Sequence, residues 1–319
     1  MSDAAVRIVG VVGPTATGKS HLALALAERF DGEIVACDST AVYRGLDIGT
    51  DKVPVTDQRG IPHHLVDLVP PTEVYSAARW AQDAARTIRA IADRGRLPVV
   101  AGGTGFYFRA LTRGLFPGPG RDDALRARLD RVAGRRGVEA LHRWLARVDP
   151  PSALRIQPRD QKRLVRALEV YLLTARPLSA HFAETAAPLP GLEVCAVGLT
   201  LPREALRDRV ARRVDAQLAR GVVDEVRELM DAGVPASAHA FSGLVYRQVL
   251  EHLRGDRDLA ATRELIIREN MRYARRQALW FRKEPGIRWF EGAGESPAIV
   301  GAALAHVEAA ISRRVPESG

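Results

Sequence analysis

Residues 13–20 carry the sequence of a phosphate-binding loop, Gly-Pro-Thr-Ala-Thr-Gly-Lys-Ser. Loops of the pattern G-x-x-x-x-G-K-[ST] turn backbone N–H groups toward one point and aim a helix N-terminus at it. The ammonium of Lys19 and the hydroxyl of Ser20 complete the cradle. A glycine-rich turn that binds nothing is disfavoured, because an apolar strand pattern precedes the loop and a helical pattern follows it. We predict that two linked phosphates are held by Gly13, Thr15, Ala16, Thr17, Gly18, Lys19 and Ser20.

Asp38 follows the next apolar run, residues 33–37, and is a candidate general base. Ligands of open α/β sheets bind outside the carboxyl ends of strands, so a carboxylate there would face the phosphate cradle. An Asx turn or a helix N-cap explains an Asp followed by Ser equally well. The residues alone leave both roles open.

Gly102 and Gly103 end the strand predicted at 97–101. A Walker-type nucleoside triphosphatase carries an Asp at such a strand end, where it holds Mg²⁺ and the attacking water. Glycine there either lets a ligand approach the backbone or makes a tight turn with positive φ, and the spacing favours neither.

Two segments concentrate positive charge in a chain whose formal net charge is +9. One contains Arg155, Arg159, Lys162, Arg163 and Arg166, and the other places Arg268, Arg272, Arg275 and Arg276 along one face of a predicted helix. Contact with nucleic acid or another polyanion is favoured over a solvated surface. Arg209 and Arg213, at i and i+4, either reach one anion together or form a solvated stripe. His63 and His64 are assigned no chemistry.

The elements that would position these residues follow an α/β order. Strands are predicted at 8–12, 33–37, 97–101 and 193–200, a long helix at 76–94, and further helices from about 203, 221, 242 and 259. This order predicts a parallel sheet with right-handed crossovers. Residues 121–182 show only helical patterns, so a helical block is inserted in the α/β core. We expect a core of residues 1–118 and 183–319, and an all-helical domain of residues 119–182.

Composition excludes several classes of protein. With 319 residues, 46% of them apolar, the chain can bury a full core, and no apolar run or leader suggests membrane insertion or secretion, so we expect a cytoplasmic protein. Cys37 and Cys195 both fall in predicted strands, and without a C-x-x-C pair neither a disulfide framework nor a zinc site is indicated. Any metal should be Mg²⁺ bound together with phosphate.

Six stretches of the chain together resemble the bacterial tRNA dimethylallyltransferase family, also called IPP transferases. They occur in the same order between residues 8 and 290. The stretches are residues 13–20, 38–50, 62–65, 102–107, 163–170 and 273–277.

The resemblance implies a P-loop NTPase-like fold and a prenyl transfer. The family transfers a dimethylallyl group from dimethylallyl diphosphate to N6 of the adenosine 3′-adjacent to the anticodon, in tRNAs that read codons beginning with U. By the resemblance, the phosphate cradle binds the diphosphate leaving group with Arg213 as a further ligand. Asp38 takes the proton from N6, and the hydroxyl of Thr104 lies beside the acceptor. Ser20 holds Mg²⁺ through the diphosphate, and the charge on the leaving oxygens is neutralised electrostatically.

The same resemblance implies that the helical insertion binds the anticodon stem-loop of tRNA, and that the enzyme is a monomer. The acceptor base enters flipped out of its stack. The family has Asp-Ser-x-Gln where this chain has Ala41, so the base contact of a Gln amide is absent here. The positions that match tRNA contacts are Asp38, Ser39, Thr40, Ala41, Thr104, Arg126, Gln161, Lys162, Arg163, Leu164 and Val165.

Two other functions share some of these features. A small-molecule kinase of the shikimate or gluconate type also has a P-loop, a strand-end Asp and a glycine-rich strand end, but it is shorter and needs no helical insertion. An RNA-binding protein with an inactive P-loop is disfavoured by the intact Lys19, Ser20, Asp38 and Thr104.

Overall fold

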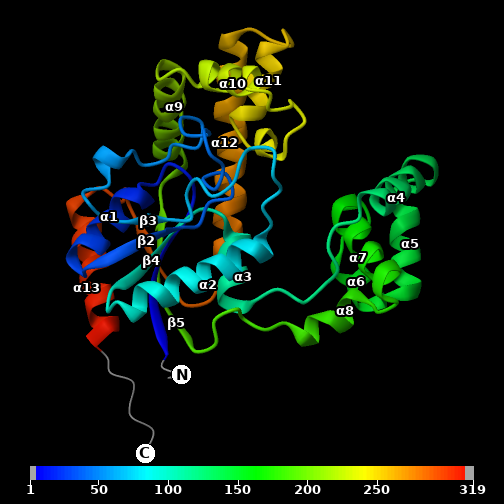
Figure 1. Ribbon diagram of the computed structural model, residues 1–319, viewed down its shortest axis with the longest axis horizontal. Coiled ribbons are helices and arrows are strands. Elements are labelled where there is room, and N and C mark those ends of the chain that lie inside the picture. The colour runs from blue at the N-terminus through cyan, green and yellow to red at the C-terminus, as the bar shows by residue number, and fades with distance from the viewer. Residues whose placement is uncertain (1–4, 313–319) are drawn as a thin grey trace, which may run out of the picture. The chain divides into compact units, whose positions relative to one another are not determined.

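The computed structural model describes residues 5–312, which divide into two compact units (Figure 1). The first unit contains the described residues up to Thr112 and those from Pro188 onward, and the second is Arg113–Ala187. No helix among the described residues is both long and apolar enough to cross a membrane.

The first unit is built on a six-stranded parallel sheet with the order β3-β2-β4-β1-β5-β6. All four predicted strands are present, and the sequence analysis missed the two edge strands β3 and β6. Cys37 follows β2 rather than lying in it, and is buried all the same. The strands are β1 (Val6–Val12), β2 (Gly32–Ala36), β3 (His63–His64), β4 (Leu97–Gly102), β5 (Leu192–Thr200) and β6 (Ile287–Glu291).

Helices cover both faces of this sheet. Alternate residues of a strand point to opposite sides, so a single strand packs against helices on both faces. Val9 and Val11 pack with α1 and with Ala303 and Val307 of α13, whereas Gly10 faces Phe108 of α3. The predicted helix near 242 is a 3₁₀ turn at His239–Ser242, after which α11 begins at Tyr246. The α-helices of this unit are α1 (Lys19–Arg29), α2 (Ala77–Asp93), α3 (Gly105–Arg113, its last residue in the second unit), α9 (Arg203–Ala219), α10 (Val222–Asp231), α11 (Tyr246–Leu253), α12 (Leu259–Phe281) and α13 (Pro297–Ser312), and a 3₁₀ turn lies at Val55–Asp57.

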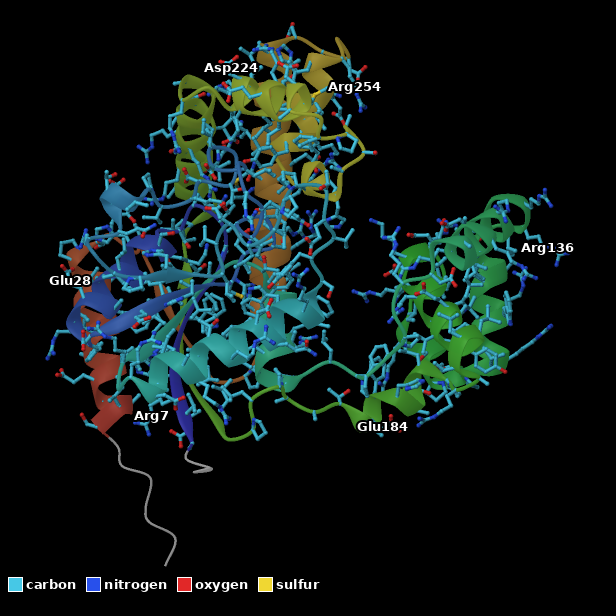
Figure 2. The ribbon with its side chains drawn as sticks, in the orientation of Figure 1. Arg7, Glu28, Arg136, Glu184, Asp224 and Arg254 are labelled. Carbon is cyan, nitrogen blue, oxygen red and sulfur yellow. The ribbon has the colours of Figure 1, made fainter. Side chains whose placement is uncertain are left out.

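The second unit is helical, around a core that includes Leu129, Leu141, Leu145 and Leu168. It holds no strand, and its single bridge joins Leu115 to Ala186. Many of its arginines are exposed, and Arg136 at the end of α4 points away from the helices in Figure 2. Its helices are α4 (Asp123–Arg136), α5 (Val138–Val148), α6 (Pro150–Arg155), α7 (Gln161–Thr174) and α8 (Leu178–His181), followed by a 3₁₀ turn at Phe182–Glu184.

Candidate active site

A cavity of about 630 Å³ lies in the first unit at the carboxyl ends of the central strands. Its walls come from the P-loop, the ends of β2 and β4, the segment 49–53, and α9 and α12. A second cavity of about 420 Å³ shares Lys19, Ser20 and Arg213 with the first. The fold therefore joins the predicted phosphate cradle to Asp38 within one continuous site.

The P-loop is bound by side chains from distant parts of the chain. Arg213 of α9 donates to the Thr15 hydroxyl at 2.6 Å, and Arg209, one turn earlier, donates to the Ala16 carbonyl at 2.6 Å. Both arginines line the second cavity with Lys19 and Ser20. The two guanidinium groups that the i, i+4 spacing could bring to one anion do meet at the phosphate loop.

Lys19 of the P-loop donates to the Pro14 carbonyl at 2.5 Å. Burial and the neighbouring Arg213 charge lower the pKa of Lys19 to about 7, although the Asp38 carboxylate opposes that shift. An anion that replaced the carbonyl contact would favour the charged ammonium. Among residues 5–312, Asp38 acts on the Lys19 charge, but no carboxylate forms an ion pair with the ammonium.

The glycines at the end of β4 are required by packing within the protein. Neither has a positive φ, so the tight-turn explanation is wrong. A Cβ on Gly102 would lie 2.1 Å from the Cys37 carbonyl oxygen, and one on Gly103 would lie 2.2 Å from the Gln277 amide. Gln277 of α12 accepts from Thr15 N–H at 2.8 Å and donates to the Gly103 carbonyl at 2.9 Å. It therefore connects the P-loop directly to the end of β4.

Asp38 shapes the turn that follows β2, which is one of the two roles that the sequence leaves open. Its Oδ1 accepts from Thr40 N–H at 2.8 Å, from the Thr40 hydroxyl at 2.7 Å and from Ala41 N–H at 3.3 Å. Among the described residues, no hydrogen bond reaches its Oδ2, and Asp38 lines the main cavity with Ser39, Thr40 and Ala41. One oxygen shapes the turn, and the other remains available to accept a proton.

Thr104 lies beside this turn but outside the lining of the cavity. Its hydroxyl oxygen accepts from Ser39 N–H at 3.1 Å and its side chain hydrogen bonds to Tyr273. Burial and the Asp38 charge raise the pKa of Tyr273 to about 12, and the Thr104 contact opposes that rise. Tyr273 lines the cavity, so a residue in contact with Thr104 borders the space that a substrate would occupy.

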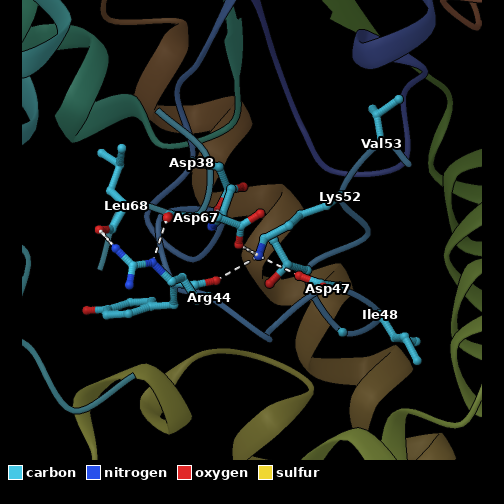
Figure 3. A network of polar contacts seen from close by, with 12 residues as sticks. Asp38, Arg44, Asp47, Ile48, Lys52, Val53, Asp67 and Leu68 are labelled. Carbon is cyan, nitrogen blue, oxygen red and sulfur yellow. Dashed lines mark hydrogen bonds and ion pairs between the residues drawn. The ribbon is translucent and has the colours of Figure 1, made fainter. Parts of the chain in front are cut away.

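Lys52 secures the segment that follows Asp38 (Figure 3). Its ammonium donates to the Tyr43 carbonyl at 2.7 Å, to the Asp47 carboxylate at 2.6 Å and to the Asp67 carboxylate. Arg44 donates in turn to the carbonyls of Asp67 and Leu68. An ammonium has three donors, and all three are used here, so Lys52 acts as a structural crosslink.

The predicted basic face of α12 is exposed. Arg268, Arg272, Arg275 and Arg276 are all exposed. Arg276 also lines the cavity and stacks on Tyr273, with its guanidinium carbon 5.6 Å from the ring centroid. A row of cations therefore runs along α12 from the edge of the cavity.

The structure places the predicted tRNA contacts of the second unit in three different settings. Lys162 and Arg163 are exposed at the start of α7, and Gln161 donates to Asp130 at 2.7 Å. Leu164 and Val165 lie in the hydrophobic core, so their side chains serve helix packing.

Arg126 already has a carboxylate partner within the second unit. It donates to both oxygens of the fully buried Glu169, at 2.8 and 2.9 Å, and Arg166 donates to the same group at 2.7 Å. The two guanidinium groups lower the pKa of Glu169 to about 2, against the opposing effect of burial. Arg126 thus joins α4 to α7 within the unit.

Comparisons with known proteins identify the family of this chain. A family model described as IPP transferase matches residues 41–284. A tRNA dimethylallyltransferase of Solibacter usitatus is 47% identical over 292 residues, which cover 92% of this chain and 95% of the relative. This chain belongs to the IPP transferase family. The relatives favour a prenyltransferase over the small-molecule kinase.

Solved structures of the family share the fold of this member. A tRNA isopentenylpyrophosphate transferase from Bacillus halodurans is 34% identical with a TM-score of 0.71, covering 95% of this chain and 96% of that one. A eukaryotic dimethylallyltransferase described as acting on tRNA is 26% identical with a TM-score of 0.80, covering 97% of this chain and 80% of that one. The predicted P-loop NTPase-like α/β fold is confirmed.

Sequence reasoning missed the cavity residues of α12. Asn270, Tyr273 and Gln277 line the cavity at i, i+3 and i+7, which places them on one side of the helix. A polar series at this spacing, adjacent to the basic face of the helix, is the signal that would have identified them. It was visible in the sequence but had no assigned role.

Proposed function

We propose that this family member transfers a dimethylallyl group from dimethylallyl diphosphate to N6 of the adenosine 3′-adjacent to the anticodon, in tRNAs that read codons beginning with U. The observation that carries the proposal is that one cavity contains both a phosphate cradle and a carboxylate with a free oxygen. A diphosphate leaving group needs the first, and an amine nucleophile needs the second.

The donor's diphosphate is assigned to the P-loop end of the site. Lys19, Arg209 and Arg213 supply positive charge there, and the N-terminus of α1 is directed at the same place. Charge that grows on the leaving oxygens during C–O cleavage is stabilised by groups already in position. Such preorganised electrostatics is commonly the largest contribution to catalysis of this kind.

The acceptor amine is assigned to the Asp38 end. The lone pair of N6 forms a bond to C1 of the dimethylallyl group while the bond from C1 to the diphosphate oxygen breaks. N6 then carries an extra proton, which passes to Oδ2 of Asp38. Oδ1 remains fixed by the Thr40 and Ala41 contacts, so the carboxylate keeps its orientation through the transfer. Thr104, whose hydroxyl accepts from Ser39 N–H beside the Asp38 turn, is proposed to place that hydroxyl beside the acceptor amine.

Magnesium fits this arrangement through Ser20 and the donor's own oxygens. Residues 5–312 contain no cluster of three or more His, Cys, Asp or Glu side chains suited to a metal, so the protein offers no complete ligand cage. Mg²⁺ is commonly held by one or two protein oxygens together with phosphates and waters. When bound it would neutralise charge on the diphosphate, and the Ser20 hydroxyl is the protein ligand that we assign to it.

The second unit is proposed to bind the anticodon stem-loop through exposed basic residues such as Lys162 and Arg163. The cationic face of α12 supplies a further surface for phosphates next to the cavity. The protein is proposed to act in the cytoplasm as a monomer.

Mass spectrometry of nucleosides tests this function. The protein is incubated with dimethylallyl diphosphate, Mg²⁺ and an unmodified tRNA that has adenosine 3′ of the anticodon, and a second tRNA carries guanosine at that position as the control. We expect dimethylallyladenosine from the first tRNA only. No prenylated nucleoside, or the same product yield from both tRNAs, would refute the proposal.

A further inference from the structure

Glu225 of α10 binds the backbone of the segment Asp47–Thr50 in a way the proposed chemistry does not use directly. Its Oε2 accepts from the N–H groups of Asp47 at 2.8 Å and Ile48 at 2.6 Å. Its Oε1 accepts from Gly49 N–H at 3.2 Å and from the Tyr246 hydroxyl at 2.8 Å. Successive N–H groups that converge on one anion are a strong and specific way to fix a loop.

Residues of the neighbouring helices α11 and α9 also hold this segment in place. The Tyr246 hydroxyl of α11 accepts from Thr50 N–H at 3.1 Å, and Gln217 of α9 donates to the Gly49 carbonyl at 3.1 Å. A Cβ on Gly49 would lie 2.6 Å from the Tyr246 ring, so only glycine lets the loop approach so closely. Tyr246 is fully buried, and burial together with the Glu225 charge raises its pKa far above the usual range. The hydroxyl therefore stays protonated and can donate to Glu225.

The loop held in this way carries two of the partners of Arg213. The Thr50 carbonyl accepts from Arg213 at 3.2 Å, and the Asp51 carboxylate lies 3.3 Å from its Nε. Arg220 pairs with the same carboxylate at 3.0 Å. The remaining arm of Arg213 reaches Thr15 in the P-loop. Moving residues 47–51 would thus release two of the contacts that hold the Arg213 guanidinium.

We infer that Glu225 is a positioning residue that fixes Arg213 for the donor's diphosphate. With Tyr246 it forms a clamp on residues 47–50, and the clamp is connected to Arg213 through Thr50 and Asp51. The inference rests on the proposed function insofar as Arg213 is taken as a diphosphate ligand. It assigns a role to a carboxylate that lies outside the cavity lining.

The test is a double-mutant cycle on the full-length protein, with inorganic diphosphate and Mg²⁺ as the probe in isothermal titration calorimetry. The variants are Glu225→Gln, Arg213→Ala and the pair combined. Gln keeps the shape but replaces one acceptor oxygen by a donor amide that faces N–H or O–H groups. Glu228→Gln, the same change at an exposed position three residues along α10, is the matched control.

We expect Glu225→Gln to weaken diphosphate binding by about tenfold or more, since small misplacements of a ligand can cost up to ~100-fold. In the Arg213→Ala background the same change should cost less than about twofold, because coupled residues give non-additive losses. Glu228→Gln should bind as the wild type does. Equal losses from Glu225→Gln in both backgrounds, or no loss in either, would overturn the inference.

Further measurements distinguish a failure of the clamp from a folding defect and from a failure of the proposed function. If Glu225→Gln does not fold, Tyr246→Phe is the substitute, because it removes only one hydroxyl from the clamp. It should show the same non-additive loss of diphosphate binding when combined with Arg213→Ala. Additive losses in that pair would refute the role of the clamp. A wild-type protein that binds no diphosphate would overturn the phosphate assignment on which the inference depends. A cycle that behaves as expected in a protein that makes no prenylated tRNA would keep the clamp and refute the proposed reaction.

Discussion

Replacing Asp38 by Asn separates its catalytic role from its structural role. The three hydrogen bonds that shape the turn all end on Oδ1, and the carbonyl oxygen of Asn accepts in the same way. The second oxygen becomes an amide that cannot take a proton. Asp38→Asn therefore removes the proposed base and leaves the turn, whereas Asp38→Ala removes both.

The two roles differ in expected magnitude. A positioned general base accelerates a reaction by about 10²–10⁴-fold, which corresponds to roughly 3–5 kcal/mol of barrier. A neutral hydrogen bond contributes about 0.5–1.5 kcal/mol of stability, so the three bonds of Oδ1 at this half-buried position are worth about 1.5–4.5 kcal/mol. Asp38→Asn should lower the reaction rate but not the stability of the folded protein, and Asp38→Ala should lower both.

Single-turnover prenylation measures the chemical step without product release, and thermal unfolding measures the stability. We expect both variants to be slowed about 10²–10⁴-fold, with tRNA affinity nearly unchanged and a lower unfolding midpoint for Asp38→Ala alone. If Asp38→Asn reacts within about tenfold of the wild type, Asp38 is only a turn former and the base lies elsewhere.

Three other expectations follow from the same site. ATP with Mg²⁺ and tRNA should release no ADP above a Lys19→Ala control, and tRNA-stimulated hydrolysis would contradict the prenyl-transfer assignment. Arg213→Ala should raise the KM for dimethylallyl diphosphate with little change in tRNA Kd, whereas Arg163→Ala should weaken tRNA binding and reduce the log–log salt slope by roughly 0.7–0.9; exchanged phenotypes would mean that the two surfaces are reversed. Because the pKa of Lys19 is lowered to about 7 in the free protein, Lys19 is mostly neutral above that pH, so diphosphate binding at pH 8 should take up a proton that is missing in Lys19→Arg. Calorimetry in buffers of different ionisation enthalpy measures that uptake, and equal uptake in both proteins would show that Lys19 is not its source.

Elements with strong local patterns were predictable from the sequence. The P-loop, the central strands and the long helix α2 follow from apolar periodicity and from glycine positions. The edge strands were missed for physical reasons: β3 has only two residues, and β6 is largely half-exposed and is defined by its pairing with β5. Strand propensity is too dependent on such pairing to identify edge strands from sequence alone.

The roles of several candidate site residues could not be predicted, because their contact partners are distant in the sequence. Arg126 was assigned as a tRNA contact by the family resemblance, and its ion pair with Glu169 could not be predicted because the two residues are 43 positions apart. Gln277 had no assigned role because its contact with Thr15 spans 262 residues. The motif around each residue was visible, but the choice between a structural and a functional role depended on contacts that only the fold creates.

The contacts around Gly102 and Gly103 also explain why this P-loop suits a diphosphate leaving group rather than hydrolysis of a γ-phosphate. An Asp at either position would collide with the Cys37 backbone or with the amide of Gln277. Cys37 precedes the proposed base, and Gln277 holds the Thr15 N–H of the phosphate loop. A water-activating carboxylate at this strand end would therefore require displacement of the elements that hold Asp38 and the P-loop. The packing that brings donor and acceptor groups into one cavity is thus the same packing that excludes the carboxylate an ATPase needs.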